Sequence, residues 1–380
     1  MTAATQVKPA RSLAMLVLGS ALMQAAVVLS STASTLLFAA DFGDRWGGLP
    51  STAAVSGVVV GSVGLTRLMG RAGRRPGLVA AYAVAAAGAG CALAGVLVQP
   101  LLVVAGLFLL GFGNAGSQLA RYAGAELYPA SRQGFALGAV VWAGTIGAVG
   151  GSALLAPAGG VAGRVGLPAL AGAFLLAIAA TGMASLVTTG VHRAALPHRR
   201  QPLPPSTPTT RVALVAMVVS QVVMVAIMIA APLHMHHHGY GLGAVGLAIS
   251  VHTLGMYALA PLSGYLCDRF GSDRLLVAGL ALLGATALAI VMAAQLTGPA
   301  LLVVLFTLGY GWNLSIVGGS ALLVRDVRTQ GTVEAWVWGG SAVGAFSSTQ
   351  LFAVGGYRFL AAASVAVAVV ALAYVVRARG

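Results

Sequence analysis

The sequence predicts an all-α integral membrane protein with twelve transmembrane helices in two pseudo-symmetric six-helix halves. Three observations support this fold class. The chain of 380 residues is 59% hydrophobic and 7% charged, whereas soluble domains carry about 25% charged residues. Twelve apolar stretches follow one another along the chain. Two sequence landmarks also recur at one offset of 198 residues, which indicates an internal duplication.

A helix needs about 20 mainly apolar residues to cross the hydrocarbon core, because its backbone polar groups must pair within the helix. The stretches that meet this condition are 12–40, 50–69, 77–98, 100–122, 133–156, 166–191, 211–233, 242–264, 274–294, 299–323, 331–353 and 356–376. Residues 192–210 contain five prolines and a cluster of basic residues, which is typical of a solvated linker. We therefore expect an N-terminal half over 1–191, a linker over 192–210 and a C-terminal half over 211–380.

The basic residues predict how the chain is oriented in the membrane. Of the 21 Lys and Arg residues, 18 lie on the side that holds both termini and the linker. Short loops rich in Lys and Arg stay in the cytoplasm, so we expect cytoplasmic termini in a plasma-membrane protein. This topology accounts for most of the net charge of +14 without a nucleic-acid partner. Nucleotide-binding loops are missing from the sequence, so we do not expect ATP-driven transport by this chain alone. We also expect that the protein is not an enzyme and that it is a monomer.

Polar side chains are distributed unevenly among the predicted helices. The third, sixth, ninth and twelfth are almost purely apolar, and the others carry polar groups at helical spacing, which indicates a face turned toward protein or water. Amides and tryptophans there suit a neutral or amphipathic organic molecule, although Trp can also anchor a helix at the membrane interface. The candidate cavity residues are Gln24, Asn114, Gln118, Arg121, Trp142, Gln221, Trp312, Asn313 and Trp338.

Few titratable side chains lie where they could couple transport to protons. The candidates are His252, Glu334 and Asp41. His252 is the first choice because an imidazole changes charge near neutral pH, but it can equally hydrogen-bond between helices. Arg121 can pair with Glu126 or meet an anionic substrate. No cofactor is expected, and the proton is the expected coupling ion.

A group of histidines ends the seventh predicted helix. The residues are His234, His236, His237 and His238. Neutral imidazoles bind Zn, Cu, Ni or Fe, and short His-rich tracts can hold such metals. The alternative is a polar loop that responds to pH. The sequence leaves both interpretations open.

The duplicated landmarks carry a family resemblance. The segment SGYLCDRFGSDR contains Gly264, Asp268, Arg269 and Gly271, and TRLMGRAGRRPG contains Arg71, Gly73, Arg74 and Arg75 at the matching positions. In the earlier copy Gly70 replaces the acid. Both segments resemble the cytoplasmic loop signature G-x-x-x-D-R-x-G-R-R of the major facilitator superfamily of secondary transporters.

This resemblance implies transport by rocking of two six-helix halves around a midplane site. It also implies that Asp268 lies against the start of the fifth helix, near Gln133 and Gly134, with Arg132 as a possible partner, and stabilises the outward-open state. Since Gly70 has no charge, we expect the matching contact at 331–353 to be weak and Asp268 to act largely alone.

Three functions are compatible with the sequence. The first is proton-coupled efflux of a small organic solute, favoured by the weakly charged cavity and by a Gly-rich fifth segment similar to that of drug:proton antiporters. The second is transport of a metal or metal chelate through the His cluster. The third is a sensor or scaffold that keeps the fold and does not transport, suggested by the degenerate first signature.

Overall fold

A computed structural model of the protein describes residues 7–42, 46, 48–192, 207–240, 242–292, 298–324 and 327–378. The regular structure of this part of the chain is helical. The helices are α1 (Val7–Phe42), α2 (Leu49–Ala72), α3 (Arg74–Leu97), α4 (Leu101–Ala125), the 3-10 turn η3 (Ala130–Arg132), α5 (Gln133–Arg164), α6 (Ala171–Thr188), α7 (Pro208–His237), α8 (Leu242–Tyr257), α9 (Ala260–Phe270), α10 (Ser272–Met292), α11 (Gly298–Leu322) and α12 (Val327–Arg377).

The expected number of spans agrees with these helices. Within the described ranges, eleven segments are long and apolar enough to cross a membrane; α8 and α9 together form one of them, and Gln350–Arg377 of α12 forms another. The remaining predicted span, 331–353, is the earlier part of α12 and is also helical. The twelve-helix prediction is therefore consistent with the structure.

The chain folds into two compact units. Unit one comprises Met1–Tyr128, Ala143–Arg200 and Asp326–Ala335, and unit two comprises the rest. Compared with the predicted halves, two helix beginnings change place: Gln133–Trp142 of α5 belongs to unit two, and Val327–Ala335 of α12 belongs to unit one. We call these two pieces the exchanged segments.

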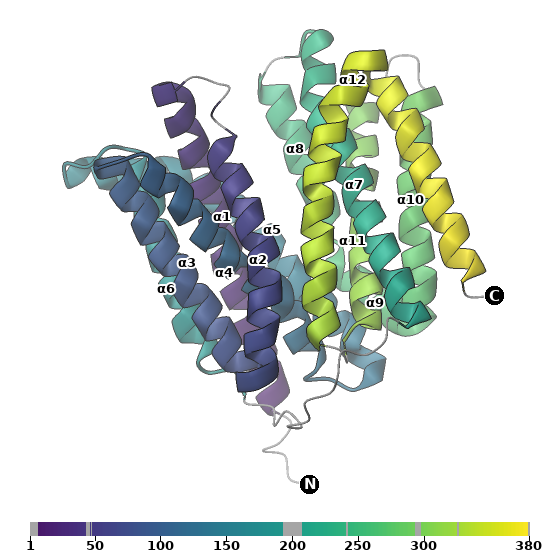
Figure 1. Ribbon diagram of the computed structural model, residues 1–380, viewed down its shortest axis with the longest axis horizontal. Helices are drawn as coiled ribbons and strands as arrows, with labels where there is room; N and C mark the ends of the chain where they lie inside the picture. Colours follow the sequence, from purple (N-terminus) through teal and green to yellow (C-terminus); the bar gives the residue numbers. More distant parts are fainter. Residues whose placement is uncertain are drawn as a thin grey trace. The chain divides into compact units, whose positions relative to one another are not determined.

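Small residues allow the helices of unit one to pack closely. A Cβ atom built on Gly88 of α3 would lie 2.6 Å from the backbone nitrogen of Leu110 in α4. On Gly106 of α4 it would lie 2.5 Å from the backbone nitrogen of Ala92 in α3. Such small residues let transmembrane helix backbones approach where lipid provides no hydrophobic drive. Figure 1 shows α3 and α6 side by side, and the two helices are in contact.

Two breaks shape the helices of unit two. α8 ends at Tyr257 and α9 begins at Ala260, with Pro261 in its first turn. Gly355 and Gly356 leave helical geometry inside α12, and Gly356 has a φ of +67°, a region that favours glycine. Figure 1 shows the chain reversing direction at this bend. A buried cluster that includes Ile227, Leu305 and Leu360 joins α7, α11 and the second part of α12.

Candidate functional site

The carboxylate of Asp268 lies at the start of α5. Its Oδ1 accepts a hydrogen bond from the backbone N–H of Gly134 at 2.7 Å, and its Oδ2 accepts one from Phe135 at 2.8 Å. The first N–H groups of a helix lack partners within the helix and carry partial positive charge, so a carboxylate is stabilised there. Asp268 therefore lies where the resemblance places it. Arg132 is exposed, and among the described contacts it makes no bond to Asp268.

Glycine on both sides makes this contact possible. A Cβ atom on Gly134 would lie 2.6 Å from the carbonyl oxygen of Gly264 and 2.8 Å from Asp268 Oδ1. A Cβ atom on Gly264 would in turn overlap the carbonyl oxygen of Gly134. The first Gly of the loop signature thus brings the backbone of α9 against the start of α5.

The other signature residues end helices or face outward. Gly73 follows α2 with a φ of +97°, and Gly271 follows α9 with a φ of +91°, so the two copies share a backbone geometry that favours glycine. Arg71 and Arg269 are exposed, and Arg75 is half-buried. The guanidinium of Arg269 donates to the hydroxyl of Tyr265 at 3.2 Å.

Arg74 holds the exchanged segment of α12. Its Nε and Nη2 donate to the two carboxylate oxygens of Glu126 at 3.1 and 2.6 Å, and Nη2 also donates to Oε1 of Gln330 at 2.6 Å. Arg74 is only 7% exposed, so these bonds form away from water. Despite the missing acid at Gly70, the first signature therefore makes a direct attachment to α12, and our expectation of a weak contact there is wrong.

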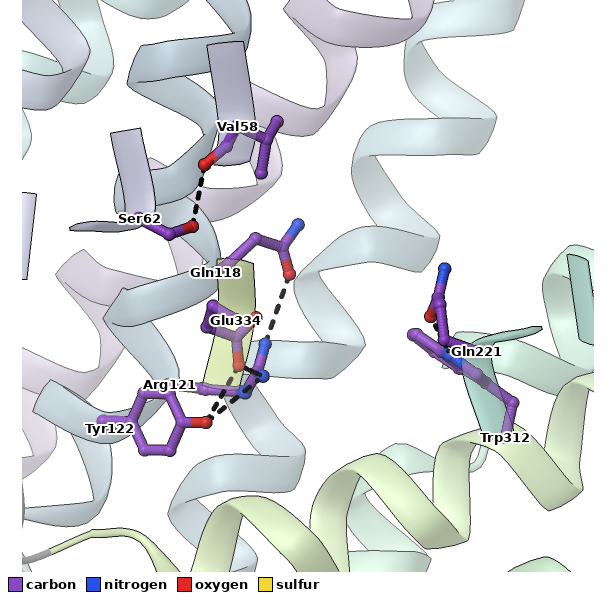
Figure 2. Close-up of polar contacts among 8 residues, drawn as sticks. All are labelled: Val58, Ser62, Gln118, Arg121, Tyr122, Gln221, Trp312 and Glu334. Atoms are coloured by element: carbon purple, nitrogen blue, oxygen red, sulfur yellow. Dashed lines mark hydrogen bonds and ion pairs between the residues drawn. The ribbon is translucent and has the colours of Figure 1, made fainter. Parts of the chain in front are cut away.

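A second buried group holds the same segment one turn later (Figure 2). Arg121 Nη2 pairs with Oε1 of Glu334, which also accepts a hydrogen bond from the hydroxyl of Tyr122 at 2.9 Å. Arg121 Nη1 donates to Oε1 of Gln118 at 3.2 Å. The Arg121 and Glu334 side chains are 5% and 1% exposed. Of the two partners left open by the sequence, Glu126 pairs with Arg74, and Arg121 pairs with Glu334.

In unit two, three candidate cavity residues come together. The indole Nε1 of Trp312 donates to Oε1 of Gln221 at 2.6 Å (Figure 2), and Nε2 of Gln221 donates to the hydroxyl of Ser341 at 2.7 Å. The neighbouring Asn313 donates from Nδ2 to the backbone carbonyl of Met256 at 2.6 Å. These groups join α7, α8, α11 and α12 through uncharged hydrogen bonds.

The remaining cavity candidates are scattered. Asn114 is buried in α4, and its Oδ1 has no hydrogen-bond partner among the described residues. Gln24 is half-buried in α1 and lies close to Gly147 of α5. Trp142 is 39% exposed, and Trp338 is half-buried.

The proton-coupling candidates lie in three different environments. Nδ1 of His252 donates to the carbonyl of Leu305 at 2.9 Å, and the ring is buried between α8 and α11. Asp41 is exposed near the end of α1. Glu334 is the one of the three that is paired with a buried base.

The histidine cluster is only partly described. The ring of His234 stacks on Tyr357 with centroids 4.6 Å apart, and it lies 4.3 Å from the ring of His238. The side chains of His236 and His237 lie outside the described residues. Within the part that the structure describes, no three His, Cys, Asp or Glu side chains gather as a metal site would require.

Sequence reasoning missed Gln330 and Tyr122. Gln330 and Glu334 are four residues apart, so they share one face of a helix, and this spacing could have indicated that both contact the same neighbouring elements. The pairing of Ser341 with Gln221 could not be found in this way, because the two residues are 120 positions apart.

Together, the long apolar helices and the buried charged groups among them define a polytopic helical membrane protein. Comparison with known proteins gives the family. The model of the Major Facilitator Superfamily matches residues 13–349, and the chain belongs to that family. It is therefore a multi-pass membrane transporter for a small-molecule solute, and it is not an enzyme.

The chain resembles three bacterial proteins over most of its length. The uncharacterised MFS-type transporter YdeG of Bacillus subtilis is 33% identical over 371 residues, which cover 89% of this chain and 84% of YdeG. YddS of the same organism is 30% identical over 82% of this chain and 78% of YddS. The riboflavin transporter RfnT of Brucella anthropi is 28% identical over 74% of this chain and 72% of RfnT.

Solved structures confirm the fold. FucP in the outward conformation matches with a TM-score of 0.75 over 97% of this chain and 100% of FucP, at 14% identity. The proton:xylose symporter XylE matches with a TM-score of 0.78 over 98% of this chain and 96% of XylE, at 13% identity. At such identities the likeness extends to the fold alone.

Proposed function

We propose that this transporter exports a small, weakly charged organic molecule across the plasma membrane in exchange for protons. It works by alternating access, as a monomer with both termini in the cytoplasm. The orientation rests on the 18 basic residues that share one side of the predicted topology.

The nature of the solute is supported by the polar groups of unit two. Gln221, Ser341 and Asn313 are uncharged and hydrogen-bonded within unit two, beside the aromatic ring of Trp312. Such a group of uncharged donors and acceptors suits a neutral or amphipathic molecule. The similarity to a riboflavin transporter supports an organic solute of this kind.

Proton coupling is supported by the Arg121–Glu334 pair, which is the observation that carries the proposal. Ionisable side chains inside membrane spans are expensive to bury and often mark proton or substrate pathways. When Glu334 takes up a proton, its charge attraction to Arg121 is lost, while the hydroxyl of Tyr122 can stay near its oxygen. Protonation of Glu334 would thus remove an ion pair that holds the exchanged segment of α12.

The first step of the test identifies the solute. Growth of a strain that lacks the gene is compared with growth of the complemented strain on a panel of toxic organic compounds, and riboflavin is tested separately in transport assays. Export predicts higher sensitivity of the deletion strain to at least one compound. Equal growth on the whole panel, together with no movement of riboflavin, would contradict the solute class.

The second step tests coupling in proteoliposomes. Glu334→Gln should lower accumulation driven by a pH gradient at least tenfold, because the pair can no longer exchange a proton, while solute exchange without a gradient continues. Since this variant leaves a buried arginine without its counter-ion, the double variant Arg121→Gln with Glu334→Gln is measured beside it. Asp273→Asn, which changes an exposed acid, is the control. Unchanged gradient-driven accumulation in Glu334→Gln would exclude this residue as the coupling site.

A further inference from the structure

We propose that the indole ring of Trp312 is a stacking surface for a planar aromatic or heteroaromatic ring in the transported molecule. The inference rests on the proposed function and adds the chemical class of the solute. It rests on the hydrogen bonds of Gln221, Ser341 and Asn313, which position two neighbouring aromatic rings in unit two.

The first step concerns the orientation of the indole. Trp312 has one hydrogen-bond donor, and this N–H is bonded to Oε1 of Gln221 at 2.6 Å. The amide of Gln221 is itself oriented, because its Nε2 donates to Ser341 Oγ at 2.7 Å. Gln221 is 5% exposed. The chain of bonds from α12 through α7 to α11 therefore fixes the direction in which the indole N–H points.

The second step concerns the neighbouring ring. Tyr257 ends α8, and its ring meets that of Trp312 edge to face, with centroids 5.8 Å apart and an angle of 82° between the planes. Pro261 has no N–H to donate to the carbonyl of Tyr257 four residues earlier. The carbonyl of Met256, in the last turn of α8, accepts a hydrogen bond from Asn313. The helix break thus places Tyr257 beside Trp312, and Asn313 holds the end of α8 in place.

The third step concerns the accessibility of the indole. A buried polar side chain costs free energy unless it is bonded, and here the indole N–H, Gln221 and Ser341 bond to one another. In a membrane helix this cost persists throughout the span. Both rings are also half-buried and keep part of their surface exposed. The hydrogen bonds therefore fix the orientation of a ring that remains partly accessible.

The fourth step gives the ligand class. The indole N–H is already used, so Trp312 offers a ligand its π face and no donor. A planar ring gains stacking energy on such a face, about 0.5–1.5 kcal/mol beyond the area that it buries. An acyclic polyol presents no flat face to the indole, and its hydroxyl groups would need donors and acceptors that this ring does not supply. The geometry therefore favours a flat ring over a polyol.

The test measures binding to the full-length protein in nanodiscs, without transport. The probe is lumichrome, a neutral tricyclic heteroaromatic compound whose fluorescence reports binding. The comparison compounds are 1-adamantanol, which is apolar but not planar, and sorbitol, a polyol. The variants are Trp312→Leu, Trp312→Phe and Gln221→Leu. The control is Trp336→Leu, which removes a tryptophan that is 61% exposed in the same unit.

Lumichrome should bind the wild type and Trp336→Leu equally. Trp312→Leu should weaken binding about tenfold, and Trp312→Phe should keep more of the affinity because a ring remains. Gln221→Leu should weaken binding severalfold although the indole is still present, since its orientation is lost. Affinities for 1-adamantanol and sorbitol should be weak and should not depend on Trp312.

Three results would overturn the inference: no binding of lumichrome to the wild type, equal affinity in Trp312→Leu and Trp336→Leu, or an equal loss of 1-adamantanol binding in Trp312→Leu. Melting temperatures of all variants identify any that fail to fold. In that case Trp312→Phe is used in place of Trp312→Leu, and Gln221→Asn in place of Gln221→Leu. Binding is measured without transport, so the two proposals can fail separately. If the protein does not bind lumichrome but exports a non-planar compound, the stacking role is excluded and the proposed function stands.

Discussion

At the scale of single residues, Arg74 shows why arginine and lysine are not equivalent in this fold. Its guanidinium reaches both carboxylate oxygens of Glu126 and the amide oxygen of Gln330 at the same time. The planar fork of arginine matches a carboxylate with two donors, whereas a lysine ammonium acts as a point charge. The charge alone therefore does not reproduce this attachment.

Arg74→Lys should lower the free energy of unfolding by about 2 kcal/mol, because bonds to a charged group are lost in a buried position. Arg71→Lys is the matched control, since Arg71 lies in the same loop region and is exposed. Unfolding can be followed with a thiol-reactive dye, because Cys91 and Cys267 are free and at least partly buried. Equal melting temperatures of the two variants would show that Arg74 acts only through its charge.

The sequence predicted some of these residues and not others for a physical reason. Asp268 belongs to a local pattern with fixed spacing, so its contact with the start of α5 could be expected from the resemblance. Gln330 lies 256 positions from Arg74, and Glu334 lies 213 positions from Arg121. Hydropathy describes each helix without its neighbours. The spans were therefore predictable, and the side-chain pairing between distant helices was not.

At the scale of helices, the two exchanged segments are held by different chemistry. The start of α5 is held through backbone N–H groups by Asp268, and glycines at 134 and 264 allow the close approach. The start of α12 is held through the side chains of Gln330 and Glu334. Of the two attachments, only that of α12 contains an ion pair that protonation of a carboxylate would break. The duplication thus preserved the position of the contact and changed the means by which it is made.

Gly134→Ala should lower transport at least tenfold, because the added methyl group would lie 2.6 Å from the carbonyl oxygen of Gly264 and separate α5 from α9. Gly160→Ala is the control: it lies in the same helix, with nothing within 4 Å of a Cβ atom. Initial transport rates at equal protein level are compared. If both variants transport alike, close backbone approach at Gly134 is unnecessary.

At the scale of the whole molecule, alternating access requires contacts of the exchanged segments to form and break in each cycle. Cys267 provides a native reporter of one of them. It is 4% exposed, and its Cβ lies 2.9 Å from the position of a Cβ on Gly134. Loss of the contact between α5 and α9 should therefore expose this thiol to a labelling reagent.

Asp268→Asn should lower the transport rate about tenfold without loss of protein, because the amide replaces a charge-assisted cap with a weaker one. The labelling rate of Cys267 should rise, and that of Cys91 in unit one should stay constant. Gly134→Ala keeps the acid beside the thiol and should raise labelling as well, which separates opening of the contact from a change in thiol reactivity. Constant Cys267 labelling in Asp268→Asn would contradict the role of this contact.

The exchanged segments also determine where this chain can be recombined with a relative. A chimera joined in the linker would separate Arg74 and Arg121 from Gln330 and Glu334, and Asp268 from the start of α5, although each parent supplies an intact six-helix half. Junctions at Tyr128, Trp142, Arg200, Arg325 and Ala335 would keep each group of partners together. The part of this protein that can be exchanged with a relative is therefore a discontinuous set of segments. The interacting residues within it must change together, although they are encoded far apart.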